Sequence, residues 1–141
     1  MPPFRLLVLA LGLLGFVAGC GSAAEADRSP GGAGVRTIDP TVGAALAENP
    51  PADLVILDVR TPEEFSEVHL EGATLLNIYD ADFADQLATL DPEAPYLIYC
   101  RSGNRSGQAA AMMEDLGFRD VSNVDGGILA WMDQGLPTIG R

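Results

Sequence analysis

The chain has 141 residues, enough for one domain of ordinary size, and its hydrophobic content of 48% is typical of a protein with a packed core. Its formal net charge is −12, and all of its basic side chains other than one histidine are arginines. So acidic a chain repels a phosphate backbone, which argues against nucleic-acid binding, and one histidine with two cysteines is too few for a Cys/His zinc cluster.

The first segment, residues 1–19, has the features of a signal peptide. Arg5 precedes an apolar run from Leu6 to Ala18, which is shorter than the ~20 residues that a membrane-spanning helix needs. Small residues directly before Cys20 resemble the lipobox of bacterial lipoproteins. The resemblance implies cleavage before Cys20 and lipidation there, palmitate included, so we expect an extracytoplasmic protein anchored to a cell membrane. A plain secretory signal and an uncleaved anchor are the alternatives.

Residues 20–34 are predicted to be a lipid-anchored flexible linker. The stretch from Gly21 to Gly34 has no large apolar residue and no periodicity. If Cys20 carries the lipid, Cys100 is the one thiol that remains. An unpaired cysteine outside the cytoplasm indicates a reactive thiol.

Residues 35–141 are predicted to form the folded domain, in which strands alternate with helices. Asp39 and Thr61 are predicted to cap the first two helices, and Phe65, Val68 and His69 to form the apolar face of the second. This alternation predicts an α/β fold with a parallel sheet and helices on both faces. The expected strands are 35–38, 54–59, 73–77, 96–99 and 120–124, and the expected helices are 40–48, 62–69, 80–90, 107–116 and 127–134.

Cys100 follows a short buried strand and precedes a loop of small, polar and basic residues that leads into a helix. A thiol in this position lies at the carboxyl end of a strand, close to the unpaired N–H groups and the positive dipole of the helix. Arg101 and Arg105 add permanent positive charge. All these features favour the thiolate, whereas a buried structural cysteine, the alternative, has no need of two nearby arginines.

Five short motifs occur in the order seen in rhodanese-like sulfurtransferases, and the chain from Val35 onward resembles that family. It contains one copy, as in single-domain members, and Val68 stands where the family usually has glycine. The resemblance implies a five-stranded parallel sheet flanked by helices. The motifs are 57–60 (LDVR), 62–65 (PEEF), 69–73 (HLEGA), 100–106 (CRSGNRS) and 126–131 (GGILAW).

The resemblance implies that Cys100 takes sulfane sulfur from a donor such as thiosulfate, forms a persulfide, and passes the sulfur to cyanide or a thiol, without a cofactor or metal. The arginines are placed to hold the sulfonate of the donor, with Arg105 the favoured one. Ser106 has two readings, as the cap of the next helix and as a donor to the persulfide. The loop residues expected to bind substrate are Arg101, Ser102, Gly103, Asn104, Arg105 and Ser106.

Asp58 and Arg60 are predicted to support the site. Asp58 ends a strand on the same edge and is expected to hold the loop backbone or Arg60 rather than act as a base. Arg60 is expected to pair with Glu63 or Glu64. His69 is expected to be a packed, hydrogen-bonded residue outside the site.

Two other functions remain open at this point. Phosphatases and arsenate reductases have a similar loop, but they place arginine six residues after the cysteine, whereas Arg105 is five after Cys100. A surface-anchored sulfur carrier or partner-binding module without significant turnover is the other alternative, and the intact cysteine with both arginines argues against a degenerate module.

Overall fold

The computed structural model describes residues 34–140; the predicted signal segment, Cys20 and the linker up to Ala33 lie outside this part, as does Arg141. Five strands form one parallel sheet in the order β1-β6-β5-β2-β4, and β3 and β7 form a separate antiparallel pair. The elements are β1 (Gly34–Ile38), α1 (Pro40–Glu48), β2 (Val55–Asp58), α2 (Pro62–Glu67), β3 (Val68–His69), β4 (Thr74–Leu75), α3 (Phe83–Ala88), β5 (Pro95–Tyr99), α4 (Asn104–Asp115), β6 (Asp120–Val124), α5 (Gly127–Asp133) and β7 (Ile139–Gly140).

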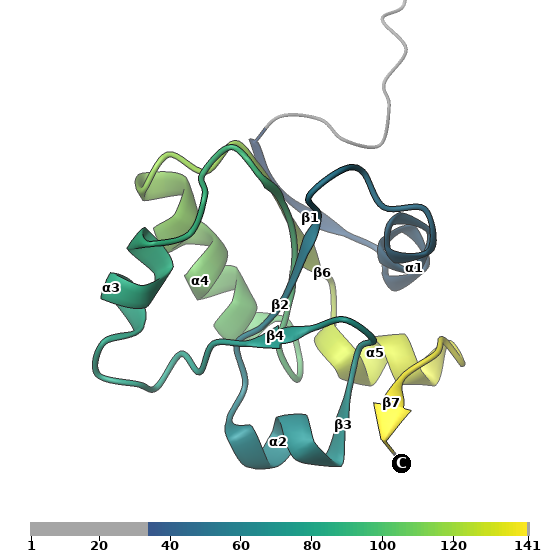
Figure 1. Cartoon of the computed structure of the whole chain (residues 1–141). Coiled ribbons are helices and arrows are strands. Elements are labelled where there is room, and N and C mark those ends of the chain that lie inside the picture. The colour runs from purple at the N-terminus through teal and green to yellow at the C-terminus, as the bar shows by residue number, and fades with distance from the viewer. Residues whose placement is uncertain (1–33, 141) are drawn as a thin grey trace, which may run out of the picture.

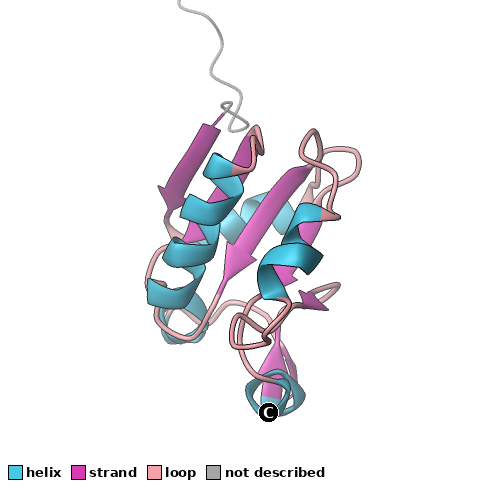
Figure 2. Cartoon of the chain, turned by 90° about the vertical axis from the view of Figure 1, so that its left-hand side faces the viewer, coloured by secondary structure: helices cyan, strands magenta, loops and turns pink. Residues whose placement is uncertain are grey.

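Helices cover both faces of the five-stranded sheet. In Figure 1, α1 and α5 lie on one side of it, and α3 and α4 lie on the other. Figure 2 shows two helices lying in front of the strands on the second face. The predicted α/β architecture is therefore confirmed. Within residues 34–140, no helix is both long and apolar enough to cross a bilayer.

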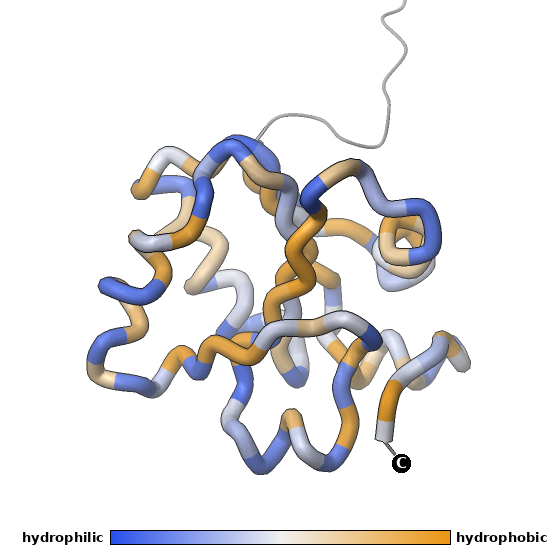
Figure 3. Tube along the Cα trace, viewed as in Figure 1, coloured by the Kyte–Doolittle hydropathy of each residue, from blue (hydrophilic) through white to orange (hydrophobic). Residues whose placement is uncertain are grey.

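Strand β5 lies inside the sheet, between β6 and β2, and its side chains alternate between two cores. Ile98 and Cys100 belong to the core under α4, with Met113 of that helix. Tyr99 belongs to the core on the opposite face, together with Trp131 of α5. Figure 3 shows the apolar residues concentrated along the central strands. Cys100 thus directly follows a strand in which the last four residues, 96–99, are all buried.

Both predicted helix caps are present. The Asp39 carboxylate accepts a hydrogen bond from the Thr41 N–H at 2.8 Å, and a proline occupies the first turn of α1. Thr61 and Glu64 form a reciprocal capping box at the start of α2. These caps fix the direction in which each helix leaves the sheet edge.

The predicted extension of the second helix to Val68 and His69 is wrong. Helix α2 ends at Glu67, the Val68 backbone is extended, and both residues form β3, which pairs with β7 at the end of the chain. Gly140 is needed in β7, because a Cβ there would clash with the Glu67 carbonyl oxygen. His69 still packs as expected: its ring stacks on Phe65 with the centroids 4.0 Å apart.

Three other boundaries differ from the prediction. The expected strand 73–77 shortens to β4, and the expected helix 80–90 shortens to α3, because tight turns occupy the flanking residues. Helix α4 begins at Asn104, three residues earlier than predicted. The early start of α4 matters most, because it places the first helical turn directly at Cys100.

Candidate active site

Cys100 follows the last residue of β5, at the carboxyl edge of the parallel sheet. Cys100 is fully buried. The three residues Arg101–Gly103 separate it from the first residue of α4. Open α/β sheets bind ligands at this edge, so the fold places the thiol where chemistry is expected.

Gly103 turns the chain from the strand into the helix. Its φ of 91° lies in the left-handed region, and it occupies the N-cap position of α4. Ser106, read from the sequence as cap or donor, is therefore not the cap; it lies in the first turn of α4. A Cβ on Gly103 would also come within 3.2 Å of the Gly126 backbone nitrogen, so two tight turns pack directly against each other here.

The Cys100 sulfur is surrounded by hydrogen-bond donors. The Gly103 N–H donates to Sγ at 3.1 Å, and the Ser106 hydroxyl donates at 3.3 Å. Burial raises the pKa of the thiol, but the Ser106 hydroxyl and the backbone N–H groups of Ser106, Ser102 and Gly103 lower it by more together. The pKa of Cys100 therefore lies below its ordinary value, which favours the nucleophilic thiolate.

Backbone N–H groups in the first turn of α5 hold the cysteine loop by hydrogen bonds. The Ile128 N–H donates to the Cys100 carbonyl at 2.9 Å, and the Leu129 N–H donates to the Arg101 carbonyl at 3.1 Å. Gly127 permits this approach, because a Cβ there would lie 2.5 Å from the Cys100 carbonyl oxygen. Gly127 also has a φ of 60°, so both its backbone conformation and this close approach require glycine.

Arg105 is held by a residue of another helix. Its guanidinium donates to both carboxylate oxygens of Glu64, at 2.8 and 2.7 Å, and lies 5.6 Å from the centroid of the Tyr79 ring. Hydrogen bonding to Arg105 lowers the pKa of Glu64 to about 2. The pKa of Arg105 is raised, chiefly by Glu64, with a smaller contribution from Cys100. The positive charge of Arg105 thus lies near the thiol but is paired with the Glu64 carboxylate.

Asp58, the last residue of β2, and Arg60, two residues beyond it, form a buried pair beside β5. The Arg60 side chain donates to both Asp58 oxygens, at 2.6 to 3.0 Å, and to the Val68 carbonyl at 2.6 Å. Its guanidinium lies over the Tyr99 ring, 5.5 Å from the centroid. Asp58 pairs with Arg60 as predicted. Arg60 forms no ion pair with Glu63 or Glu64, the partners expected for it, within residues 34–140. The pair ties β2, β3 and β5 together beside the loop.

The remaining loop side chains are open to solvent. Arg101, Ser102 and Asn104 are exposed. Arg101 makes no ion pair with any residue of the part that the structure describes. Among residues 34–140, no group of three or more His, Cys, Asp or Glu side chains is arranged to hold a metal ion. The site therefore offers a thiol, a ring of N–H donors and one uncommitted cation.

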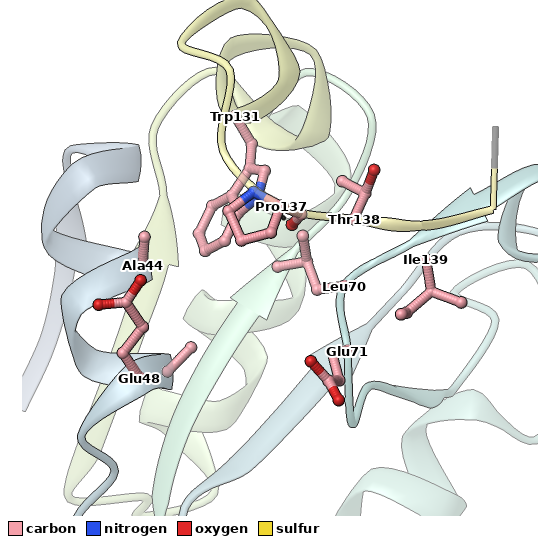
Figure 4. Close-up of a pocket in the computed structure, with 9 residues that line it drawn as sticks. Ala44, Glu48, Leu70, Glu71, Trp131, Pro137, Thr138 and Ile139 are labelled. Atoms are coloured by element: carbon pink, nitrogen blue, oxygen red, sulfur yellow. Dashed lines mark hydrogen bonds between the residues drawn. The ribbon is translucent and has the colours of Figure 1, made fainter.

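A separate hollow of about 340 Å³ lies apart from the thiol, between α1, α5 and the end of the chain. Trp131, Pro137 and Leu70 form its apolar wall, with the carboxylates of Glu48 and Glu71 at its rim (Figure 4). The Trp131 N–H donates to the Pro137 carbonyl and fixes this wall. No residue of the cysteine loop lines the hollow.

Comparison with known proteins shows what this arrangement resembles. The profile of the rhodanese-like domain matches residues 41–134. Thiosulfate sulfurtransferase GlpE of Pseudomonas putida is 40% identical over 77 residues, which cover 55% of this chain and 68% of that protein. Probable adenylyltransferase/sulfurtransferase MoeZ of Mycobacterium tuberculosis is 37% identical over 84 residues, or 60% of this chain, but the match spans only 21% of that longer protein.

A solved structure agrees with these sequence matches. The solution structure of the rhodanese-like domain of the Anabaena protein Alr3790 superposes with a TM-score of 0.65 at 28% identity. The superposition covers 74% of this chain and 79% of the Anabaena chain. The match therefore extends over most of the folded part in both molecules.

Proposed function

This chain belongs to the rhodanese-like family, and from that premise we propose that it is a sulfurtransferase that carries sulfane sulfur as a persulfide on Cys100. One observation carries the proposal: Sγ accepts hydrogen bonds from Gly103 and Ser106 at the start of a helix, with its pKa lowered. A ring of donors of this kind stabilises an anionic thiolate and, after sulfur transfer, an anionic persulfide. Relatives named as sulfurtransferases support the same class of reaction.

The reaction has two steps. The Cys100 thiolate attacks the outer sulfur of a donor such as thiosulfate; a bond forms between Sγ and that sulfur, the sulfur–sulfur bond of the donor breaks, and its electron pair leaves with sulfite. An acceptor, cyanide or a thiol, then attacks the outer sulfur of the persulfide, and Cys100 leaves again as a thiolate. The sulfur is carried covalently between two substrates, as in other nucleophilic catalysis, and no cofactor enters either step.

The loop residues divide the work. We assign the sulfonate end of the donor to Arg101, which is exposed and has no ion pair within residues 34–140, rather than to Arg105, the arginine favoured from the sequence, because Arg105 is paired with Glu64. Arg105 adds positive field near the sulfur. The backbone N–H groups of Ser102, Gly103 and Ser106 hold the anion, with Asn104 opening the helix beside them. Asp58 and Arg60 are positioning residues, because their buried pair fixes the strands from which the loop departs.

We further propose that the protein is anchored to a cell membrane through lipidated Cys20, outside the cytoplasm. Small residues ahead of Cys20 support the proposal. The described part begins at Gly34, which pairs with Asp120 at the amino ends of the parallel strands. Cys100 lies at the opposite, carboxyl edge. The linker therefore joins the domain at the end remote from the active site, which leaves the loop free to meet substrates.

A steady-state assay tests the proposed turnover. With thiosulfate as donor and cyanide as acceptor, the purified protein should form thiocyanate and sulfite in equal amounts. Double-reciprocal plots at several acceptor concentrations should be parallel, because the sulfur leaves the donor before the acceptor binds. The Cys100→Ser variant should form neither product. Intersecting plots would show that both substrates bind before sulfite leaves, and turnover by Cys100→Ser would show that Cys100 does not carry the sulfur; either result contradicts the proposed mechanism.

A further inference from the structure

Arg101 differs from every other arginine in the described part of the chain. Residues 34–140 contain five arginines, and four of them pair with carboxylates: Arg36, Arg60, Arg105 and Arg119. Arg101 is the one without such a partner, and it is exposed in a chain of net charge −12. An uncommitted cation next to the nucleophile favours substrates that carry negative charge.

A small cleft of about 130 Å³ adjoins Arg101. Val68 of β3 and Leu129 and Met132 of α5 give it apolar walls. Its other sides are lined by Arg60, which is paired with Asp58, and Glu64, which is paired with Arg105. Glu67, which also lines it, is exposed at the end of α2. The volume is about that of four water molecules, so the cleft admits a short aliphatic group and excludes a large ligand.

Two apolar side chains of the cleft are unusually open. Leu129 is 41% exposed and Met132 is 37% exposed, three residues apart on one face of α5. The Leu129 N–H donates to the Arg101 carbonyl, which fixes this face directly beside the loop. Apolar surface held next to a cation suits a molecule that has a hydrocarbon chain and an anionic end.

We propose that the sulfur acceptor is a small aliphatic thiol that bears a carboxylate, with its chain against Leu129 and Met132 and its carboxylate on Arg101. The inference rests on the proposed sulfurtransferase function and names its acceptor class. Cys100 itself is fully buried, so the acceptor thiolate attacks the outer persulfide sulfur. A new sulfur–sulfur bond forms on the acceptor, the bond to Sγ breaks, and its electron pair returns to the Cys100 thiolate.

Cyanide provides the internal comparison. It has two heavy atoms and no hydrocarbon chain, so it gains nothing from the apolar walls. A thiol of the length of 3-mercaptopropionate buries its methylene groups against them, each worth several-fold in binding. The structure therefore predicts that substitution of Leu129 and Met132 changes the preference between thiol and cyanide, rather than the formation of the persulfide.

The test uses full-length protein preloaded with thiosulfate, with the gain of one sulfur on Cys100 checked by intact mass. The discharge rate is then measured with 3-mercaptopropionate, cysteamine and cyanide, and each variant is compared with the wild type for the same acceptor. A Leu129→Ser/Met132→Ser double variant should slow 3-mercaptopropionate about 10-fold relative to cyanide. Arg101→Gln should slow 3-mercaptopropionate about 10-fold and leave cysteamine unchanged or faster. Leu116→Ser, 44% exposed in the wild type and outside the cleft, should change no ratio.

Two results overturn the inference. If the double variant slows all acceptors equally, or slows none, the apolar face does not contact the acceptor. If Arg101→Gln affects cysteamine as much as 3-mercaptopropionate, the carboxylate is not recognised. In both cases the loaded persulfide is verified by intact mass before discharge is measured, so these failures are distinct from failure of the proposed function. A protein that gains no sulfur from any sulfane donor overturns both.

Discussion

Glu64 of α2 and Arg105 of α4 form a two-pronged ion pair, with oxygen–nitrogen distances of 2.8 and 2.7 Å, across 41 positions of the sequence. The same Glu64 carboxylate also accepts from the Thr61 N–H in the capping box of α2. One acidic residue therefore fixes the start of a helix and the cation of the cysteine loop. Paired planar groups of this kind hold geometry as well as charge.

The Glu64–Arg105 pair makes the stability of the protein depend on pH. The pKa of Glu64 is lowered from 4.5 to about 2 by Arg105. Since folding lowers this pKa, the pair stabilises the protein fully above about pH 4.5, and the contribution is lost as the pH falls toward 2. Glu64→Gln should lower the free energy of unfolding by about 1 kcal/mol at neutral pH, a modest amount for a partly exposed pair.

Urea unfolding of the wild type and Glu64→Gln at a series of pH values measures this effect. The difference between the two proteins should shrink as the pH falls below 4.5. Glu63→Gln, which alters a neighbouring exposed acid without an ion pair in the described part, is the matched control and should show little difference. A Glu64→Gln difference that stays constant with pH would rule out the pair as its source.

Ser106→Ala should raise the pKa of Cys100. The hydroxyl of Ser106 is the largest of the contributions that lower this pKa, and alanine removes it while keeping the backbone N–H. The ultraviolet absorbance of the thiolate, followed against pH, should move to higher pH, and persulfide formation should slow at neutral pH. Ser102→Ala is the control, because Ser102 acts through its backbone N–H. Superimposable titrations of wild type and Ser106→Ala would refute the assigned role.

Two glycines near the loop should respond in opposite ways to alanine. Gly127 has a φ of 60°, and an added Cβ would lie 2.5 Å from the Cys100 carbonyl oxygen, so Gly127→Ala should cost at least about 2 kcal/mol of stability and most of the activity. Gly107 lies in α4 with no atom closer than 3.8 Å to an added Cβ, so Gly107→Ala should stabilise by about 0.5–1 kcal/mol. Thermal unfolding of both variants measures the two changes in stability, and equal changes would contradict the packing of α5 on the loop.

Cys20→Ala tests the anchor. Small residues before Cys20 predict lipidation, so the wild type should sediment with membranes and carry the mass of attached acyl chains. The variant should lose both properties while its activity in detergent-free solution is retained, because the residues that form the site lie between Asp58 and Leu129, far along the sequence from Cys20. A wild-type protein that is soluble and unlipidated by mass would contradict the proposed anchor.

The fold was predictable because its signals are local. Periodicity and caps at Asp39 and Thr61 determine where helices begin, and short apolar runs mark the buried strands. The β3–β7 pair was missed because two-residue strands carry no periodicity, and their pairing joins segments about 70 positions apart. The start of α4 was misplaced because Asn104 and Ser106 have weak helix propensity, and the packed turn at Gly103 overrides it.

The candidate site was predictable in its reactive residues and less so in their partners. Cys100 and the loop stand together in the sequence, so their proximity needs no tertiary information. The Glu64–Arg105 pair and the bonds from Ile128 and Leu129 connect distant segments, and nothing in the sequence selects those partners. The adjacent Gly126 and Gly127 were the available signal, since two glycines at the start of a helix indicate close approach of another backbone.

Intact mass spectrometry of the protein after exposure to thiosulfate tests the central claim most directly. The account predicts a gain of one sulfur atom on Cys100, reversed by cyanide or a thiol, and no gain in Cys100→Ser. Arg105 stands five residues after Cys100, one fewer than in phosphatase loops, so aryl phosphates should not be hydrolysed. A protein that hydrolyses aryl phosphates and gains no sulfur from thiosulfate or any other sulfane donor would contradict the sulfurtransferase account.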